Sequence, residues 1–176
     1  MDNTENTYEY LTAVGTCFTA SVTSTDTTMT FISAFLFLLL AVFALASASN
    51  VNFVNRCGYS VEVIRTANNQ QSASEGWLNP GQSFTRWYGG NGMNFKNGWN
   101  GRTLAEFTFN GWNNLDFYDL SVIDGFDIGM QISASTGGPT VTCTYAGCPD
   151  AYQYPSDNSK NHGTRTGGTF NVVFCP

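Results

Sequence analysis

The chain has 176 residues, of which 11% are charged and 15% aromatic, and its formal net charge at pH 7 is −6. This length suits one globular domain, and so apolar a composition excludes a generally disordered chain. Residues 103–150 hold six acids and no Lys or Arg. A cluster of one sign repels phosphates and attracts cations or hydroxyl-rich ligands, so nucleic acid is excluded as a partner.

The N-terminal part of the chain differs from the rest. Residues 31–48 read FISAFLFLLLAVFALASA, an uncharged apolar run that ends in small residues. This pattern predicts a signal peptide over residues 29–48 and therefore a secreted, extracellular protein. An uncleaved membrane anchor is the alternative, because about 18 apolar residues are the lower limit of a spanning helix.

The segment before the apolar run, residues 1–28, contains no basic residue, although a signal peptide normally begins with one. We therefore expect a disordered leader there, or a translation start at Met29. Cleavage after Ala48 would remove four acids and no base, which leaves 9 acids against 7 bases. The formal charge of the whole chain thus overstates that of the mature part.

Short alternating runs dominate the sequence after Ser49. Residues 51–66 read VNFVNRCGYSVEVIRT, two such runs broken by Cys-Gly-Tyr, which is a hairpin-like pattern. Further short runs follow at residues 84–88, 104–110, 120–123, 127–133, 140–145 and 169–175. Gly, Asn, Asp and Pro occupy the connections between them. The pattern predicts an all-β fold, a sandwich or flattened barrel.

One stretch breaks this alternation. Residues 89–102 read GGNGMNFKNGWNGR and are rich in Gly and Asn. We expect a long surface loop whose aromatic residues, Phe95 and Trp99, fold onto the sandwich. A platform on which sugar rings stack is the alternative.

The cysteines predict covalent links. Four of the five lie in the mature part, and an even number in a secreted chain indicates two disulfides. Three pairings are open. Cys57 near the mature N-terminus and Cys175 near the C-terminus suggest a clasp of the two ends, with Cys143 and Cys148 closing a short loop. No Cys-x-x-Cys pair exists, and His162 lies in a polar run typical of a surface loop, so we predict no metal site and no cofactor.

Six motifs between residues 54 and 176 carry a resemblance to a known family. In chain order they read VNRCGY, LNPGQS, TLAEFTFNG, DFYDLSVIDGF, GCPDAYQYP and FNVVFCP. They resemble, in the same order, the motifs of thaumatin-like proteins, the osmotin and zeamatin relatives among pathogenesis-related plant proteins. The resemblance implies a thaumatin-like antiparallel β-sandwich over residues 49–176.

The same resemblance implies the disulfide pairing Cys57–Cys175 and Cys143–Cys148. In the family, a disulfide that ends at the position of Cys148 encloses a loop-rich second domain. Only residues 144–147 separate Cys143 from Cys148 here. We therefore expect a small form of the family that lacks the second domain.

Family members line a surface cleft with an Arg, a Glu and three Asp. The resemblance assigns four acids of this chain to the cleft: Glu106, Asp119, Asp124 and Asp150. Either Lys96 or Arg102 would supply the basic residue. Asp116 and Asp127 match no cleft position, and we expect them to be solvated surface acids.

The function that this resemblance implies is binding of β-1,3-glucan from fungal cell walls, by a monomeric defence protein. Carboxylates can accept hydrogen bonds from several sugar hydroxyls. A weak endo-β-1,3-glucanase is the first alternative, with Glu106 as proton donor and Asp119 or Asp124 as nucleophile or base. The expected loss of one cleft wall favours binding over catalysis, because an open site excludes little water. A second alternative is inhibition of a glycosidase such as xylanase, as small family members do.

Overall fold

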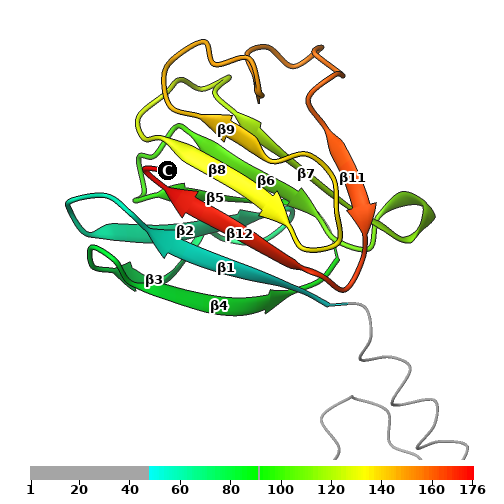
Figure 1. Cartoon of the computed structure of the whole chain (residues 1–176), viewed down its shortest axis with the longest axis horizontal. Coiled ribbons are helices and arrows are strands. Elements are labelled where there is room, and N and C mark those ends of the chain that lie inside the picture. The colour runs from blue at the N-terminus through cyan, green and yellow to red at the C-terminus, as the bar shows by residue number, and fades with distance from the viewer. Residues whose placement is uncertain (1–47, 91) are drawn as a thin grey trace, which may run out of the picture. The chain divides into compact units, whose positions relative to one another are not determined.

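The computed structural model describes residues 48–90 and 92–176, which form two β-sheets packed face to face (Figure 1). The sequence predictions for residues 1–28, and for a signal peptide or anchor up to residue 47, lie outside the described residues. Within the described ranges, no helix combines the length and the apolar character needed to cross a membrane.

The five-stranded sheet lies at the front of Figure 1. Its strands, in spatial order, are β4 (Ser83–Tyr88), β1 (Ser49–Asn55), β12 (Thr169–Phe174), β8 (Met130–Ala134) and β9 (Val141–Cys143). The strands β1 and β12 come from opposite ends of the domain and pair in parallel, with Asn50 opposite Thr169 and Asn55 opposite Phe174. The other neighbours in this sheet are antiparallel.

The seven-stranded sheet lies behind it. Its spatial order is β10 (Ala151–Tyr152), β7 (Leu115–Ser121), β6 (Leu104–Thr108), β5 (Met93–Asn97), β2 (Val61–Ala67) and β3 (Ala73–Leu78). The remaining strand, β11 (His162–Arg165), pairs with the first half of β7. A short 3-10 helix, η1 (Trp112–Asn114), connects β6 to β7. The two sheets confirm the predicted sandwich, with β10–β7 as a second parallel pair.

The core between the sheets is rich in aromatic rings. Phe53 of β1 packs against Phe95 of β5 with ring centroids 4.8 Å apart. Farther along, Phe170 of β12 lies 5.3 Å from Phe107 of β6 and 5.4 Å from Tyr118 of β7. These contacts cross from one sheet to the other, because alternate residues of each strand point inward and the aromatic ones occupy inward positions.

The structure corrects the hairpin expected over residues 51–66. The two runs do form strands, β1 and β2, but they belong to different sheets and do not pair with each other. Asn55 explains the separation: its side-chain amide donates to the carbonyls of Tyr59 and Leu78, both at 2.8 Å. The buried amide holds the crossing chain between the sheets instead of letting it fold back as a hairpin.

The surface loop expected over residues 89–102 is also wrong in its central part. Residues 93–97 form β5, a central strand of the seven-stranded sheet, and Phe95 is fully buried. Only Trp99, 56% exposed, behaves as a loop aromatic. His162, expected in a loop, begins strand β11, with its ring centroid 5.8 Å from that of Tyr118.

Both predicted disulfides are present. Cys57 and Cys175 follow the parallel strands β1 and β12, and their Cα atoms lie 5.1 Å apart. Cys143, the last residue of β9, bonds to Cys148 with the Cα atoms 5.3 Å apart. The first bridge clasps the two ends of the domain, and the second closes the loop of residues 144–147.

Candidate functional site

Two acids face each other on the outer surface of the seven-stranded sheet. Glu106 on β6 lies directly opposite Asp119 on β7 in the antiparallel register. Their strand neighbours Ala105 and Leu120 are fully buried in the core. Because side chains alternate along a strand, Glu106 and Asp119 point away from the core. Directly opposed residues have Cβ atoms about 5 Å apart, so the two carboxyl groups can touch.

The carboxyl groups of Glu106 and Asp119 lie within hydrogen-bonding reach of each other. Burial, the charge of Glu106 and hydrogen bonding to its carboxyl group raise the pKa of Asp119 to about 8. No N–H or O–H of the described residues donates to the buried Oδ1 of Asp119, which favours a proton on this carboxyl. At neutral pH, Asp119 therefore donates to an ionised Glu106, and the pair carries one negative charge.

Burial also raises the pKa of Glu106, and two neighbours oppose this effect by hydrogen bonding. Hydrogen bonding by the Asp119 carboxyl and by the Ser121 hydroxyl lowers the pKa of Glu106. The charge of Asp124 raises it further. The three acids that match family positions most clearly thus lie within electrostatic reach of one another.

Asp124 reaches this cluster because the chain turns after β7. The Gly125 N–H donates to the Val122 carbonyl at 3.0 Å, and Gly125 has a φ of +116°, which favours glycine. Arg102 lies over this turn, where its guanidinium donates to the Phe126 carbonyl at 3.3 Å. Asp124 itself is exposed.

A groove of about 310 Å³ opens beside the acid pair. Thr66 on β2, Asn94 on β5, Glu106 and Asp119 are successive cross-strand partners, and they form one polar row across four strands. All four line the groove, together with Asn161 and, toward the β6–β7 connection, Phe117. Sequence reasoning missed Thr66, Asn94 and Asn161, because their placement depends on strand register and not on residue type.

Two other predicted site residues lie apart from this row. Lys96 lies half-buried on β5, two residues beyond Asn94 and therefore on the same face of the sheet. Asp150 is half-buried before β10, and its Oδ2 accepts a hydrogen bond from the Thr142 N–H at 3.0 Å. Neither residue lines the groove, and their assignment to a cleft stays a prediction.

The two remaining acids of residues 103–127 have structural contacts. Asp116 is fully buried, so its prediction as a solvated acid is wrong. It accepts hydrogen bonds from the Ser49 hydroxyl and from the Asn110 N–H. Asp127 is exposed, as expected, but it also accepts from the N–H groups of Arg102 and Thr103, at 2.8 and 2.6 Å.

Comparison with known sequences identifies similar proteins. Residues 88–147 match the family model described as the Thaumatin family. A thaumatin-like protein of Oryza sativa subsp. japonica is 36% identical over 157 residues, which cover 74% of this chain and 87% of the relative. Thaumatin-like pathogenesis-related protein 3 of Avena sativa is 36% identical over 170 residues, which cover 82% of this chain and 98% of the relative.

Comparison with solved structures agrees on the fold. The thaumatin-like xylanase inhibitor TLXI superposes with a TM-score of 0.57 at 19% identity, over 72% of this chain and 99% of that one. The protein elicitor MoHrip2 from Magnaporthe oryzae gives the same TM-score of 0.57 at 18% identity, over 73% and 99%. At these identities, the likeness shows a common fold and no more.

Proposed function

This chain belongs to the thaumatin family, and we propose that it is a secreted defence protein that binds β-1,3-glucan of fungal cell walls. The relatives described as pathogenesis-related proteins support the defence role. The observation that carries the choice of ligand is the groove beside the paired carboxyl groups of Glu106 and Asp119.

The chemistry of the groove suits a neutral sugar chain. Its polar row combines a hydroxyl on Thr66, an amide on Asn94 and the carboxyl pair, which together offer both donors and acceptors. The carboxylate oxygens of the pair accept hydrogen bonds from sugar hydroxyls, and the single negative charge disfavours acidic ligands. The volume of about 310 Å³ lies at the lower end of ligand pockets, which span about 300–1,000 Å³.

The same pair favours binding over hydrolysis. Glycosidases place two carboxyl groups on either side of the scissile bond, about 5 Å apart in retaining enzymes and more in inverting ones. Glu106 and Asp119 are direct cross-strand neighbours on one face of the sheet, so both carboxyl groups lie on the same side of a bound sugar chain. We therefore propose that the groove holds the glucan without cleaving it.

A sedimentation assay tests the proposal. The oxidised mature protein is incubated with insoluble β-1,3-glucan, and both the pelleted protein and the released reducing sugar are measured. We expect pelleting without sugar release. Glu106→Gln replaces the carboxylate that accepts from sugar hydroxyls by an amide, and it should weaken pelleting about tenfold. Glu62→Gln makes the same chemical change on β2 of the same sheet, away from the groove, and should leave pelleting unchanged.

Three results would overturn parts of this proposal. Sugar release that Glu106→Gln abolishes would replace binding by glucanase activity. Pelleting unaffected by Glu106→Gln would move the glucan site elsewhere on the surface. If the protein bound a soluble xylanase but did not bind glucan, its partner would be a glycosidase and not a polysaccharide.

A further inference from the structure

A second cavity, of about 500 Å³, opens at the edge of the sandwich where strands β2 and β3 approach β4. Ala67, Asn68 and Met93 line both this cavity and the groove beside Glu106, so the two cavities are neighbours. The walls of this second cavity, here called the arginine pocket, include the side chains of Arg65, Gln70, Glu75, Arg86 and Tyr88.

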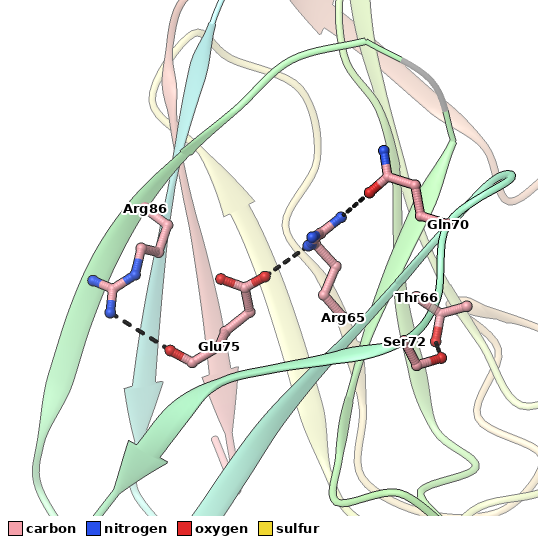
Figure 2. A network of polar contacts seen from close by, with 6 residues as sticks. All are labelled: Arg65, Thr66, Gln70, Ser72, Glu75 and Arg86. Carbon is pink, nitrogen blue, oxygen red and sulfur yellow. Dashed lines mark hydrogen bonds and ion pairs between the residues drawn. The ribbon is translucent and has the colours of Figure 1, made fainter.

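Arg65 is held in place by two side chains, as Figure 2 shows. Its Nε donates to Glu75 Oε1 at 2.6 Å, and its Nη1 donates to Gln70 Oε1 at 3.0 Å. Both members of the ion pair are mostly shielded, with side-chain exposures of 21% for Arg65 and 15% for Glu75. The charge of Arg65 is thus balanced by Glu75, while its Nη2 makes no protein hydrogen bond within the described residues.

Arg86 approaches Glu75 from the opposite side in Figure 2, but it bonds only to backbone. It donates to the carbonyl oxygens of Thr85 at 3.2 Å and Glu75 at 3.5 Å. Its guanidinium carbon lies 4.6 Å from the centre of the Phe84 ring, a cation–π contact that limits its motion. No carboxylate of the described residues forms an ion pair with it. The pocket therefore has one positive charge in excess, on a positioned side chain.

Tyr88 adds a buried hydroxyl beside the carboxylate of Glu75. Its ring packs on Phe95 of the core at 5.0 Å, and its hydroxyl oxygen is buried without a well-formed hydrogen bond among the described residues. Burial, the charge of Glu75 and a weak hydrogen-bonding interaction with its carboxylate raise the pKa of this hydroxyl, which keeps it protonated. A buried hydroxyl without a well-formed hydrogen bond is costly unless a water or ligand fills the position.

We propose that the arginine pocket binds a uronate, a sugar ring that carries a carboxylate, within an acidic wall polysaccharide. Arg86 and the free Nη2 of Arg65 bind the carboxylate, because guanidinium groups match its planar pair of oxygens. The hydroxyl of Tyr88, the amide of Gln70 and the second oxygen of Glu75 bind the ring hydroxyls. One excess positive charge suits a monoanion, and Glu75 disfavours a phosphate dianion.

This site differs from the proposed glucan groove in charge and does not depend on it. The groove has one excess negative charge at Glu106 and Asp119, whereas the arginine pocket has one excess positive charge at Arg86. The two hollows should therefore select different wall polymers, one neutral and one acidic.

Isothermal titration calorimetry of the oxidised mature protein with trigalacturonate tests the proposal, with cellotriose as a neutral ligand of equal length. We expect trigalacturonate to bind, cellotriose to bind at least tenfold more weakly in this pocket, and the trigalacturonate affinity to fall as salt rises. Arg86→Gln should weaken trigalacturonate binding at least tenfold, and Tyr88→Phe should weaken it several-fold.

Two variants serve as matched controls. Arg165→Gln makes the same charge change on exposed β11, at the far edge of the seven-stranded sheet, and should leave the affinity for trigalacturonate unchanged. Glu106→Gln should also leave it unchanged, which separates this site from the glucan groove. If Arg86→Gln and Arg165→Gln lost the same affinity for trigalacturonate, the effect would come from net charge alone, and the proposal would be overturned. Equal affinity for the two trisaccharides, or no binding of trigalacturonate, would also overturn it.

Discussion

Glu106 and Asp119 are direct cross-strand partners, and burial together with the charge of Glu106 raises the pKa of Asp119. The pKa of Asp119 in the folded protein is about 8, above the usual value of 3.8. Between these two values, the folded state binds more protons than the unfolded chain, so stability falls as pH rises. We expect the free energy of unfolding to be highest near pH 4 and to decrease up to about pH 8, as measured by urea denaturation.

The variant Asp119→Asn checks the origin of this pH dependence. Its amide replaces the protonated carboxyl, so the variant should lose little stability at pH 4 and should be more stable than the parent at pH 8. Glu62→Gln should leave the pH dependence unchanged. If the free energy of unfolding of Asp119→Asn fell with pH as steeply as that of the parent protein, the proton would not reside on Asp119.

The buried carboxylate of Asp116 connects three segments. It accepts from the Ser49 hydroxyl and, at 2.7 Å, from the Asn110 N–H, while the Ser49 oxygen accepts from the Gly167 N–H at 3.0 Å. Asp116→Ala would leave these donors unpaired in the interior, and we expect a loss of about 3 kcal/mol in the free energy of unfolding. Chemical denaturation of the variant and of the parent protein at pH 7 measures this loss.

Two exposed acids provide the comparison for Asp116. Asp127→Ala removes the Oδ1 atom that accepts from two backbone N–H groups, and water can partly replace it, so the variant should cost about 1 kcal/mol. Asp124→Ala, at an exposed turn position, should cost less than about 0.5 kcal/mol. A loss at Asp116 no larger than that at Asp124 would contradict the structural role assigned here.

The two disulfides should differ in their contribution to stability. The bridge Cys57–Cys175 spans 118 residues and Cys143–Cys148 spans 5. In the chain-entropy model, bridges of these lengths are worth about 5 and about 2 kcal/mol. Replacing each pair by serine and measuring thermal unfolding should therefore show the larger loss for the first pair. The reverse order would indicate strain in the long-range bridge or residual structure in the unfolded chain.

Gly138 and Tyr118 are in close contact. The Tyr118 hydroxyl donates to the Pro139 carbonyl at 2.6 Å, and a Cβ at Gly138 would lie 2.6 Å from that hydroxyl oxygen, at a φ of +94°. We expect Gly138→Ala to cost about 2 kcal/mol and Tyr118→Phe about 1 kcal/mol. The double variant should lose less than the sum, because removal of the hydroxyl relieves the clash. Strict additivity in this double-mutant cycle would contradict the contact.

Much of the architecture could be predicted from sequence because its signals are local. Alternation identified most strands, and turn residues such as Gly125 marked their ends. The motif resemblance identified both disulfides, and it led to Glu106 and Asp119, which the structure does place side by side. Each of these inferences needed only a short stretch or a matched motif.

The structure differs from the sequence predictions where distant residues decide the outcome. Asp116 has the appearance of a surface acid, and only the approach of Ser49 and Asn110 makes its burial favourable. The strand β5 forms in a stretch rich in Gly and Asn, which have low strand propensity, because burial of Phe95 overcomes that preference. The arginine pocket combines residues of three strands and a turn, and no sequence pattern connects them.

The parallel pairing of β1 with β12 also affects how the chain can fold. The strand β12 follows every other described strand along the chain, yet it lies at the centre of the five-stranded sheet, between β1 and β8. Such a high contact order predicts slow folding, because the loop between β1 and β12 must close before their contacts form. Until residues 169–175 leave the ribosome, β1 and β8 present open edges, and Cys57 lacks the thiol with which it pairs.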